Sequence, residues 1–156
     1  MGTGGATCDD HAVNERDAHR LVEDFEHRRL PKPRWTHEAH LVVCRAVVQR
    51  LGPDAALDHL RRAIRSYNES TNTANTDTGG YHDTLTAYYV GAVDVVSPIA
   101  LADLVAHPAC ARTAPLTHWS SDRLFSVAAR RNWVPPDREP LTWWSPDLVG
   151  PAGGQR

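Results

Sequence analysis

Three histidines are the residues of this sequence whose type and spacing could do chemistry. His37 and His40 are three positions apart. On a helix they would lie on adjacent turns of one face, with Cβ atoms roughly 5–6 Å apart and ring nitrogens able to converge on one ion. His82 belongs to a second amphipathic segment whose apolar stripe has nearly the same register. Because packing the two stripes together would bring three imidazoles to one point, we predict a metal site formed by His37, His40 and His82.

Such a site has the ligands of a transition metal. Three neutral imidazoles with an open position suit Fe, Zn or Cu, and also Ni, and the ion could activate water, oxygen or a substrate group. We favour redox over hydrolytic chemistry, since no general-base carboxylate is placed beside the histidines. Glu26, at the edge of the first apolar helix face, and His118 are candidate fourth ligands or partners that orient an imidazole.

Two other interpretations of the histidines compete with this one. Each ring could be a side chain at the edge of the core with an ordinary hydrogen bond, although burial without a partner would cost roughly 1–3 kcal/mol per ring. The run His37-Glu38-Ala39-His40 also approaches the HExxH motif of zinc proteases. It is one residue too short, so the ligand spacing of that motif is lost and we reject a protease.

Candidate catalytic residues lie near the predicted ion or on a later helix. Tyr81 follows two glycines and directly precedes His82, which places its hydroxyl beside the site. Arg123 and Arg130 are seven positions apart, hence on one side of a single helix, and could hold a substrate carboxylate or phosphate. The alternative to substrate binding is that the two arginines lie on a solvent-exposed helix face or form ion pairs within the protein.

Apolar residues at helical spacing predict an all-α, single-domain bundle of five to six helices. Thr36 and Asp54 are candidate N-caps, and the segment 68–80 is too polar to be core. After Trp133 the chain is rich in Pro and Trp and should be irregular. We expect a disordered leader over 1–10, a helical domain over 11–145 and a flexible tail over 146–156. The predicted helices cover residues 11–29, 37–51, 54–67, 81–96, 98–105 and 120–130.

Composition narrows the class of protein. The formal net charge of −2 gives no global reason to bind nucleic acid, and no apolar run approaches the roughly 20 residues that cross a membrane. Cys8, Cys44 and Cys110 form no CxxC pair and are odd in number, which favours free thiols in a reducing compartment. With no signal-peptide pattern at the start, we expect a cytoplasmic protein of undetermined oligomeric state.

Three motifs together resemble a family of small, uncharacterised bacterial helical proteins. The motifs are Trp35–Leu41, which reads WTHEAHL, Asn75–Thr84, which includes GYHDT, and Arg123–Ser126. The resemblance covers about residues 20–141. It implies that the histidines belong to a shared site, and it names no activity.

These observations lead to one main hypothesis and two alternatives. The main hypothesis is a small metalloenzyme that acts on a small, possibly acidic substrate. The first alternative is a non-enzymatic, metal-stabilised binding or sensing module. The second is a protein without metal, in which the histidines form a polar pocket or provide general acid–base chemistry near neutral pH.

Overall fold

The computed structural model describes residues 14–148, and these form an all-helical bundle with no strand among them. Its longer helices are α1 (Glu15–Glu26), α2 (His37–Leu51), α3 (Pro53–Ser70) and α4 (Asp83–Val96), and the shorter ones are α5 (Leu101–Ala106), α6 (Ser121–Leu124) and α7 (Val127–Arg131). Short 3-10 turns link them at Lys32–Arg34, Pro108–Cys110, Ala114–Thr117 and Pro146–Leu148. The predicted fold class is therefore confirmed.

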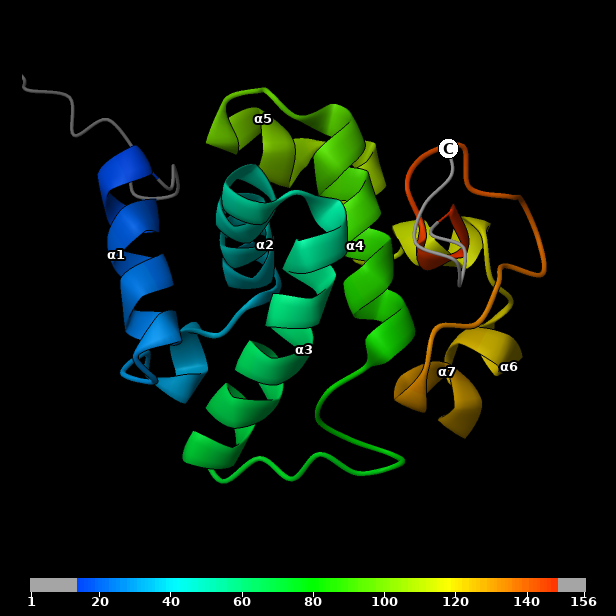
Figure 1. The fold of residues 1–156 in the computed structure, drawn as a ribbon, viewed down its shortest axis with the longest axis horizontal. Helices are drawn as coiled ribbons and strands as arrows, with labels where there is room; N and C mark the ends of the chain where they lie inside the picture. The colour runs from blue at the N-terminus through cyan, green and yellow to red at the C-terminus, as the bar shows by residue number, and fades with distance from the viewer. Residues whose placement is uncertain (1–13, 149–156) are drawn as a thin grey trace, which may run out of the picture.

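Helix α2 is the centre of the bundle. It packs against α1, α3 and α4, while α6, α7 and the C-terminal segment lie on the far side of α4 from α1 (Figure 1). The side chains of Val43 and Val47 in α2 and of Val90 in α4 are fully buried, and Leu60 of α3 is 2% exposed. Burying these side chains supplies the main hydrophobic stabilisation of the bundle.

The start of α2 follows the sequence pattern. The Thr36 hydroxyl accepts a hydrogen bond from the amide of Ala39 at 3.2 Å, which makes Thr36 the predicted N-cap. The start of α3 differs from the prediction, because the helix begins at Pro53 after Gly52, whose φ is 77°. Asp54 is then within the first turn, where its carboxylate accepts a hydrogen bond from Trp144 Nε1 at 2.6 Å.

Helix α4 starts two residues later than predicted. The backbone of His82 is extended, and its ring accepts a hydrogen bond from the amide of Leu85, so His82 is the N-cap of α4. A cap residue points back at the helix end and does not share the helix's apolar stripe. The predicted common register of His82 with the stripe of α2 is therefore wrong. Helix α5 also begins later, at Leu101.

The predicted sixth helix is two short helices. Ser120 caps α6 and Ser126 caps α7, each accepting a hydrogen bond from the amide three residues on. The break around Phe125 separates Arg123 from Arg130. They therefore do not lie on one helix face, as their spacing of seven had suggested.

The tryptophan-rich C-terminal segment covers the outer side of α4. Trp119 is fully buried and Trp144 is 7% exposed. Gly91 of α4 provides the room, since a Cβ atom there would meet the backbone oxygen of Trp144 and the Trp143 ring. The segment is thus irregular, as predicted, and it packs against α4.

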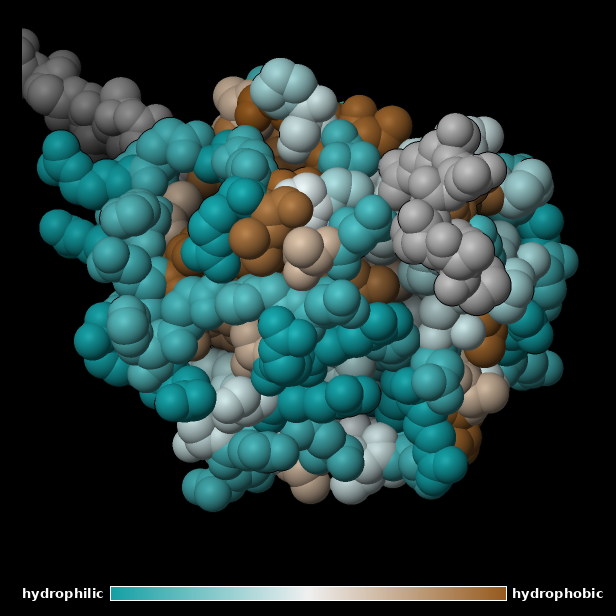
Figure 2. All heavy atoms as spheres, viewed as in Figure 1, coloured by the Kyte–Doolittle hydropathy of each residue, from teal (hydrophilic) through white to brown (hydrophobic). Residues whose placement is uncertain are grey.

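Hydrophilic side chains cover most of α1 and α3 on the face shown in Figure 2, where hydrophobic residues show only in small patches. None of the helices in the described part of the chain is long and apolar enough to cross a membrane. The predicted leader 1–10, the predicted helix start at His11 and the predicted tail beyond Leu148 lie outside the described residues.

Candidate functional site

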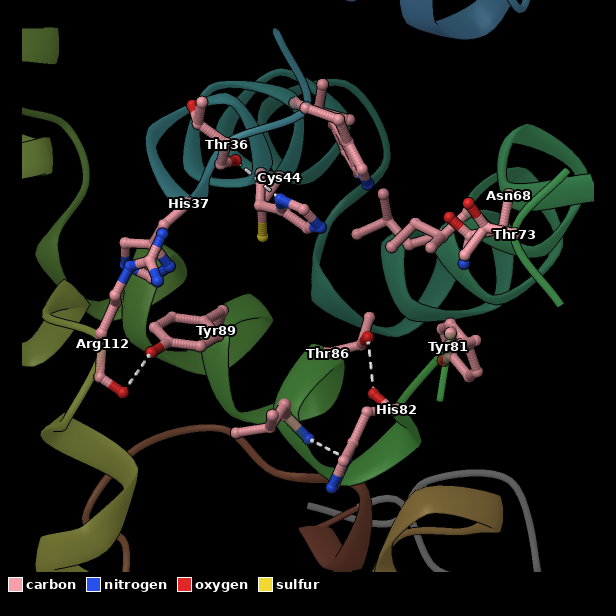
Figure 3. A pocket seen from close by; sticks show the side chains of 17 residues that line it. Thr36, His37, Cys44, Asn68, Thr73, Tyr81, His82, Thr86, Tyr89 and Arg112 are labelled. Atoms are coloured by element: carbon pink, nitrogen blue, oxygen red, sulfur yellow. Dashed lines mark hydrogen bonds between the residues drawn. The ribbon is translucent and has the colours of Figure 1, made fainter. Parts of the chain in front are cut away.

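A cavity of about 540 Å³ opens between α2, α3 and α4. Its size is that of pockets that hold small molecules. The loop that joins α3 to α4 and the segment after Cys110 complete its wall (Figure 3). Apolar and aromatic side chains make up much of the lining: Trp35, Val43, Cys44, Leu60, Ile64, Tyr81, Leu85 and Tyr89. The polar side chains in the wall are Thr36, His37, His40, Asn68, Thr73, His82, Thr86 and Arg112, and Gly80 lies among them.

His40 presents an unoccupied acceptor to this cavity. Its Nδ1 lies 2.7 Å from the carbonyl oxygen of Thr36, and because a carbonyl can only accept, Nδ1 carries the proton. Nε2 then holds the lone pair and has no hydrogen bond within residues 14–148. The Trp35 ring packs on the imidazole with 3.7 Å between ring centroids. Burial, together with the charges of His37 and Arg112, lowers the pKa of His40 to about 4, so the ring is neutral at neutral pH.

His37 positions the segment that carries Arg112. Its Nε2 donates to the carbonyl oxygen of Cys110 at 2.7 Å, and the Tyr89 hydroxyl donates to the carbonyl of Ala111 at 2.8 Å. The backbone on both sides of this turn is thereby tied to α2 and α4. Arg112 itself is exposed, lines the cavity, and makes no side-chain hydrogen bond or ion pair with the described residues. Its guanidinium is available to a ligand.

His82 has no lone pair left for a metal ion. Its Nε2 donates to the carbonyl oxygen of Leu124 at 2.8 Å, and its Nδ1 accepts from the amide of Leu85 at 3.2 Å. The two bonds fix the neutral tautomer. Burial lowers the pKa of the His82 ring, which makes the protonated form less favourable still. The ring connects the start of α4 to the end of α6, which is a structural role.

The other two predicted ligands lie elsewhere. Glu26 contacts His59 of α3 at 2.8 Å and Arg50 at 3.7 Å, and it lines a separate groove between α1 and α2. The Nδ1 of His118 donates to the carbonyl of Glu139 at 2.8 Å, on the side of α4 that the C-terminal segment covers. Within residues 14–148 no three His, Cys, Asp or Glu side chains are arranged to hold a metal ion. The donors do not fit the predicted three-histidine site.

The predicted catalytic residues are engaged in structural contacts. The Tyr81 hydroxyl donates to Asp83 Oδ1 at 2.7 Å, and the pKa of Tyr81 is raised by burial and by this carboxylate. Arg123 donates to the carbonyl of Pro135. Arg130 donates to the carbonyls of Gly80 and Tyr81 and so holds the loop that borders the cavity. Of the three, only Tyr81 lines the cavity.

Arg112 and Asn68 are site residues that the sequence analysis missed. Asn68 was assigned to the start of a polar loop, but α3 continues through it to Ser70. Arg112 stands in an irregular stretch between two 3-10 turns, where no periodicity relates it to His37 or His40. The only signal for Asn68 was the 3.6-residue repeat of α3, which continues from Leu60 and Ile64 to this position.

The cavity is electrostatically one-sided. None of the described residues that line it is an aspartate or a glutamate, whereas Arg112 carries a full positive charge. A cationic ligand would lose solvation here without gaining an ionic partner, whereas an anion would gain one.

Comparison of the chain with protein-family models, with curated proteins and with solved structures finds no match. The resemblance to small bacterial proteins drawn from the three motifs therefore stays a prediction. The role of the cavity has to be argued from its own residues.

Proposed function

We propose that the protein binds a small organic anion in the cavity between α2, α3 and α4. Arg112 would hold the acidic group, and the neutral His40 ring would accept a hydrogen bond from the ligand through Nε2. The observation that carries the proposal is Arg112, a guanidinium without a protein partner in the described chain, at the wall of a cavity whose described lining has no carboxylate. Guanidinium groups bind carboxylate and phosphate in paired hydrogen bonds.

The properties of His40 favour binding over acid–base catalysis. A general base works best when its pKa lies near the operating pH, and the pKa of His40 is lowered to about 4. A ring with such a pKa is a poor proton acceptor at neutral pH but a good neutral hydrogen-bond acceptor. Among the functions considered from the sequence, this supports the protein without metal whose histidines form a polar pocket, rather than the metal-stabilised binding or sensing module.

A metal-dependent enzyme is the second candidate. It is favoured by His37 and His40 both lining the cavity, each with one ring nitrogen that has no hydrogen bond to the described residues. Two such donors are fewer than the three protein ligands that catalytic zinc sites use, and His82 cannot supply the third in this arrangement. We therefore place it behind anion binding.

Thermal-shift screening followed by calorimetry tests the first proposal. A panel of carboxylic acids and phosphate monoesters of four to twelve carbons should contain compounds that raise the melting temperature of the wild-type protein. Arg112→Ala should weaken their binding at least about tenfold, because a charged hydrogen-bonding partner is lost. Arg20→Ala, which removes an exposed arginine on α1, is the charge-matched control. Equal binding by the two variants, or no binding by the wild type, would contradict the proposal.

A further inference from the structure

The orientation of the Asn68 carboxamide is fixed by its neighbours. Asn75 Nδ2 donates to the carbonyl of Arg65 at 3.2 Å, and Asn75 Oδ1 accepts from the amide of Tyr81 at 3.0 Å. These main-chain partners settle which atom of Asn75 is the oxygen. Asn68 must therefore turn its own Nδ2 toward that oxygen, 2.9 Å away, and its Oδ1 away from it.

This leaves the Asn68 oxygen as an acceptor without a partner. Asn68 is 6% exposed and lines the cavity, and its Oδ1 accepts no hydrogen bond from the described residues. The side chain as a whole is buried, but its oxygen keeps contact with the cavity and is not among the fully buried side-chain atoms that lack a partner in the described chain. A ligand that donates to this oxygen would take the place of solvent there. The atom is thus a place where the cavity can recognise an N–H or O–H group.

Asn68 and Arg112 are at opposite ends of the cavity. Figure 3 shows Arg112 and His37 at one end, and Asn68 with Thr73 and Tyr81 at the other. Cys44 and Thr86 lie between the two ends (Figure 3), and the lining also includes the apolar side chains of Val43, Leu60, Ile64 and Leu85. A ligand that fills the cavity would meet a cation at one end, a mainly apolar lining that includes the neutral acceptor of His40, and a second neutral acceptor, Asn68, at the other end.

From this arrangement, and resting on the proposed function, we infer that the ligand is a two-ended organic acid: its carboxylate pairs with Arg112, an apolar body crosses the middle, and a neutral hydroxyl or amide N–H at the far end donates to Asn68 Oδ1. A second anionic group at the far end would face the Asn68 oxygen and be repelled. An ammonium group there would lie near the guanidinium of Arg65, which is 4.5 Å from the centre of the Tyr81 ring. A hydroxyl or amide N–H can donate to the Asn68 oxygen without bringing a second charge to that end.

Matched pairs of acids test the inference. One pair is 3-(4-hydroxyphenyl)propanoate and 3-phenylpropanoate, and further pairs of four to twelve carbons differ by a terminal hydroxyl or amide. Calorimetry on the full chain should show the hydroxylated or amidated member binding about tenfold tighter in the pairs that bind, the size of one well-made hydrogen bond. Asn68→Leu should abolish this preference and keep the affinity for the member without the donor.

Thr76→Ala is the matched control, because it removes the hydrogen bond from the Thr78 amide to the Thr76 hydroxyl in the same loop and leaves the Asn68–Asn75 hydrogen bond in place; it should retain the preference. Equal affinity of both members for the wild type, with both weakened by Arg112→Ala, would overturn the inference while the proposed anion site stands. Loss of the preference in both Asn68→Leu and Thr76→Ala would also overturn it, since the loop and not the oxygen would then be responsible. Failure of every acid to bind would overturn both proposals.

Discussion

His82 and Leu124 are joined by a hydrogen bond of 2.8 Å from the imidazole Nε2 to the main-chain carbonyl, across 42 positions of the chain. The other ring nitrogen of His82 caps α4 through the amide of Leu85. One side chain thus caps the start of α4 and connects it to the end of α6. Both ring nitrogens of His82 are used in these structural hydrogen bonds, although the residue lines the cavity.

Substitutions of His82 should separate these two bonds. His82→Ala should lower the free energy of unfolding by about 2 kcal/mol, since it removes an N-cap and a buried hydrogen bond that contribute about 1 kcal/mol each. His82→Asn should cost about half as much, because asparagine is a strong N-cap that cannot reach the Leu124 carbonyl in the same way. Urea unfolding followed by circular dichroism measures both. Asparagine no better than alanine would argue against the capping role.

The same bonds bear on metal binding. Protein purified without a histidine tag or chelator should hold well below one transition-metal ion per chain by elemental analysis, because of the three predicted ligands only His37 and His40 keep a ring nitrogen without a partner among the described residues. Near-stoichiometric metal that is lost in both His37→Ala and His82→Ala variants of intact fold would contradict this arrangement. It would restore the three-histidine metal site predicted from the sequence.

The sequence was informative where local rules determine structure. The Thr36 cap and the helix that follows it could be predicted, because a threonine before an amphipathic run satisfies orphan amides within one turn. The role of His82 could not, since a histidine beside an apolar run fits a helix stripe and a cap equally well by spacing alone. What decided between them was a tertiary bond to Leu124, which no local pattern records.

Arg112 was beyond prediction for the same reason. Its place at the cavity depends on two tertiary hydrogen bonds, from His37 to Cys110 and from Tyr89 to Ala111, that hold an irregular turn against α2 and α4. Arg123 and Arg130 had the more regular spacing. Because the helix breaks between α6 and α7, a spacing of seven positions does not place these two arginines on one helix face.

The stability of the protein should depend on pH through His40. The folded chain lowers the pKa of this ring from 6.5 to about 4, so the unfolded chain binds the proton first as the pH falls. The free energy of unfolding contributed by His40 is therefore complete above pH 6.5 and is lost progressively down to about pH 4. The upper limit of this loss is about 3.5 kcal/mol, at roughly 1.4 kcal/mol per unit of pKa.

His40→Asn tests this contribution by urea unfolding at pH 7.0, 5.5 and 4.5. The fall in the free energy of unfolding between pH 7.0 and 4.5 should be smaller in the variant than in the wild type. It should not vanish, because burial also lowers the pKa of His82. His27→Asn, at an exposed position after α1, is the control and should follow the wild type. A His40 variant with the wild-type pH dependence would show that the ring is solvated in the folded protein.

Gly91 should be required for the C-terminal segment to pack on α4. Alanine would favour the helix by about 1 kcal/mol, but its Cβ would overlap the Trp144 carbonyl and lie 2.7 Å from Trp143 Cδ1. Because backbone cannot give way cheaply, we expect Gly91→Ala to lower the free energy of unfolding by about 2 kcal/mol and to shift tryptophan fluorescence toward the red as the segment loosens. Gly79→Ala is the matched control, since the nearest atom to its Cβ would be 3.7 Å away, and it should behave like the wild type. Unchanged fluorescence and stability in Gly91→Ala would mean that the tryptophan segment does not rest on α4 in solution.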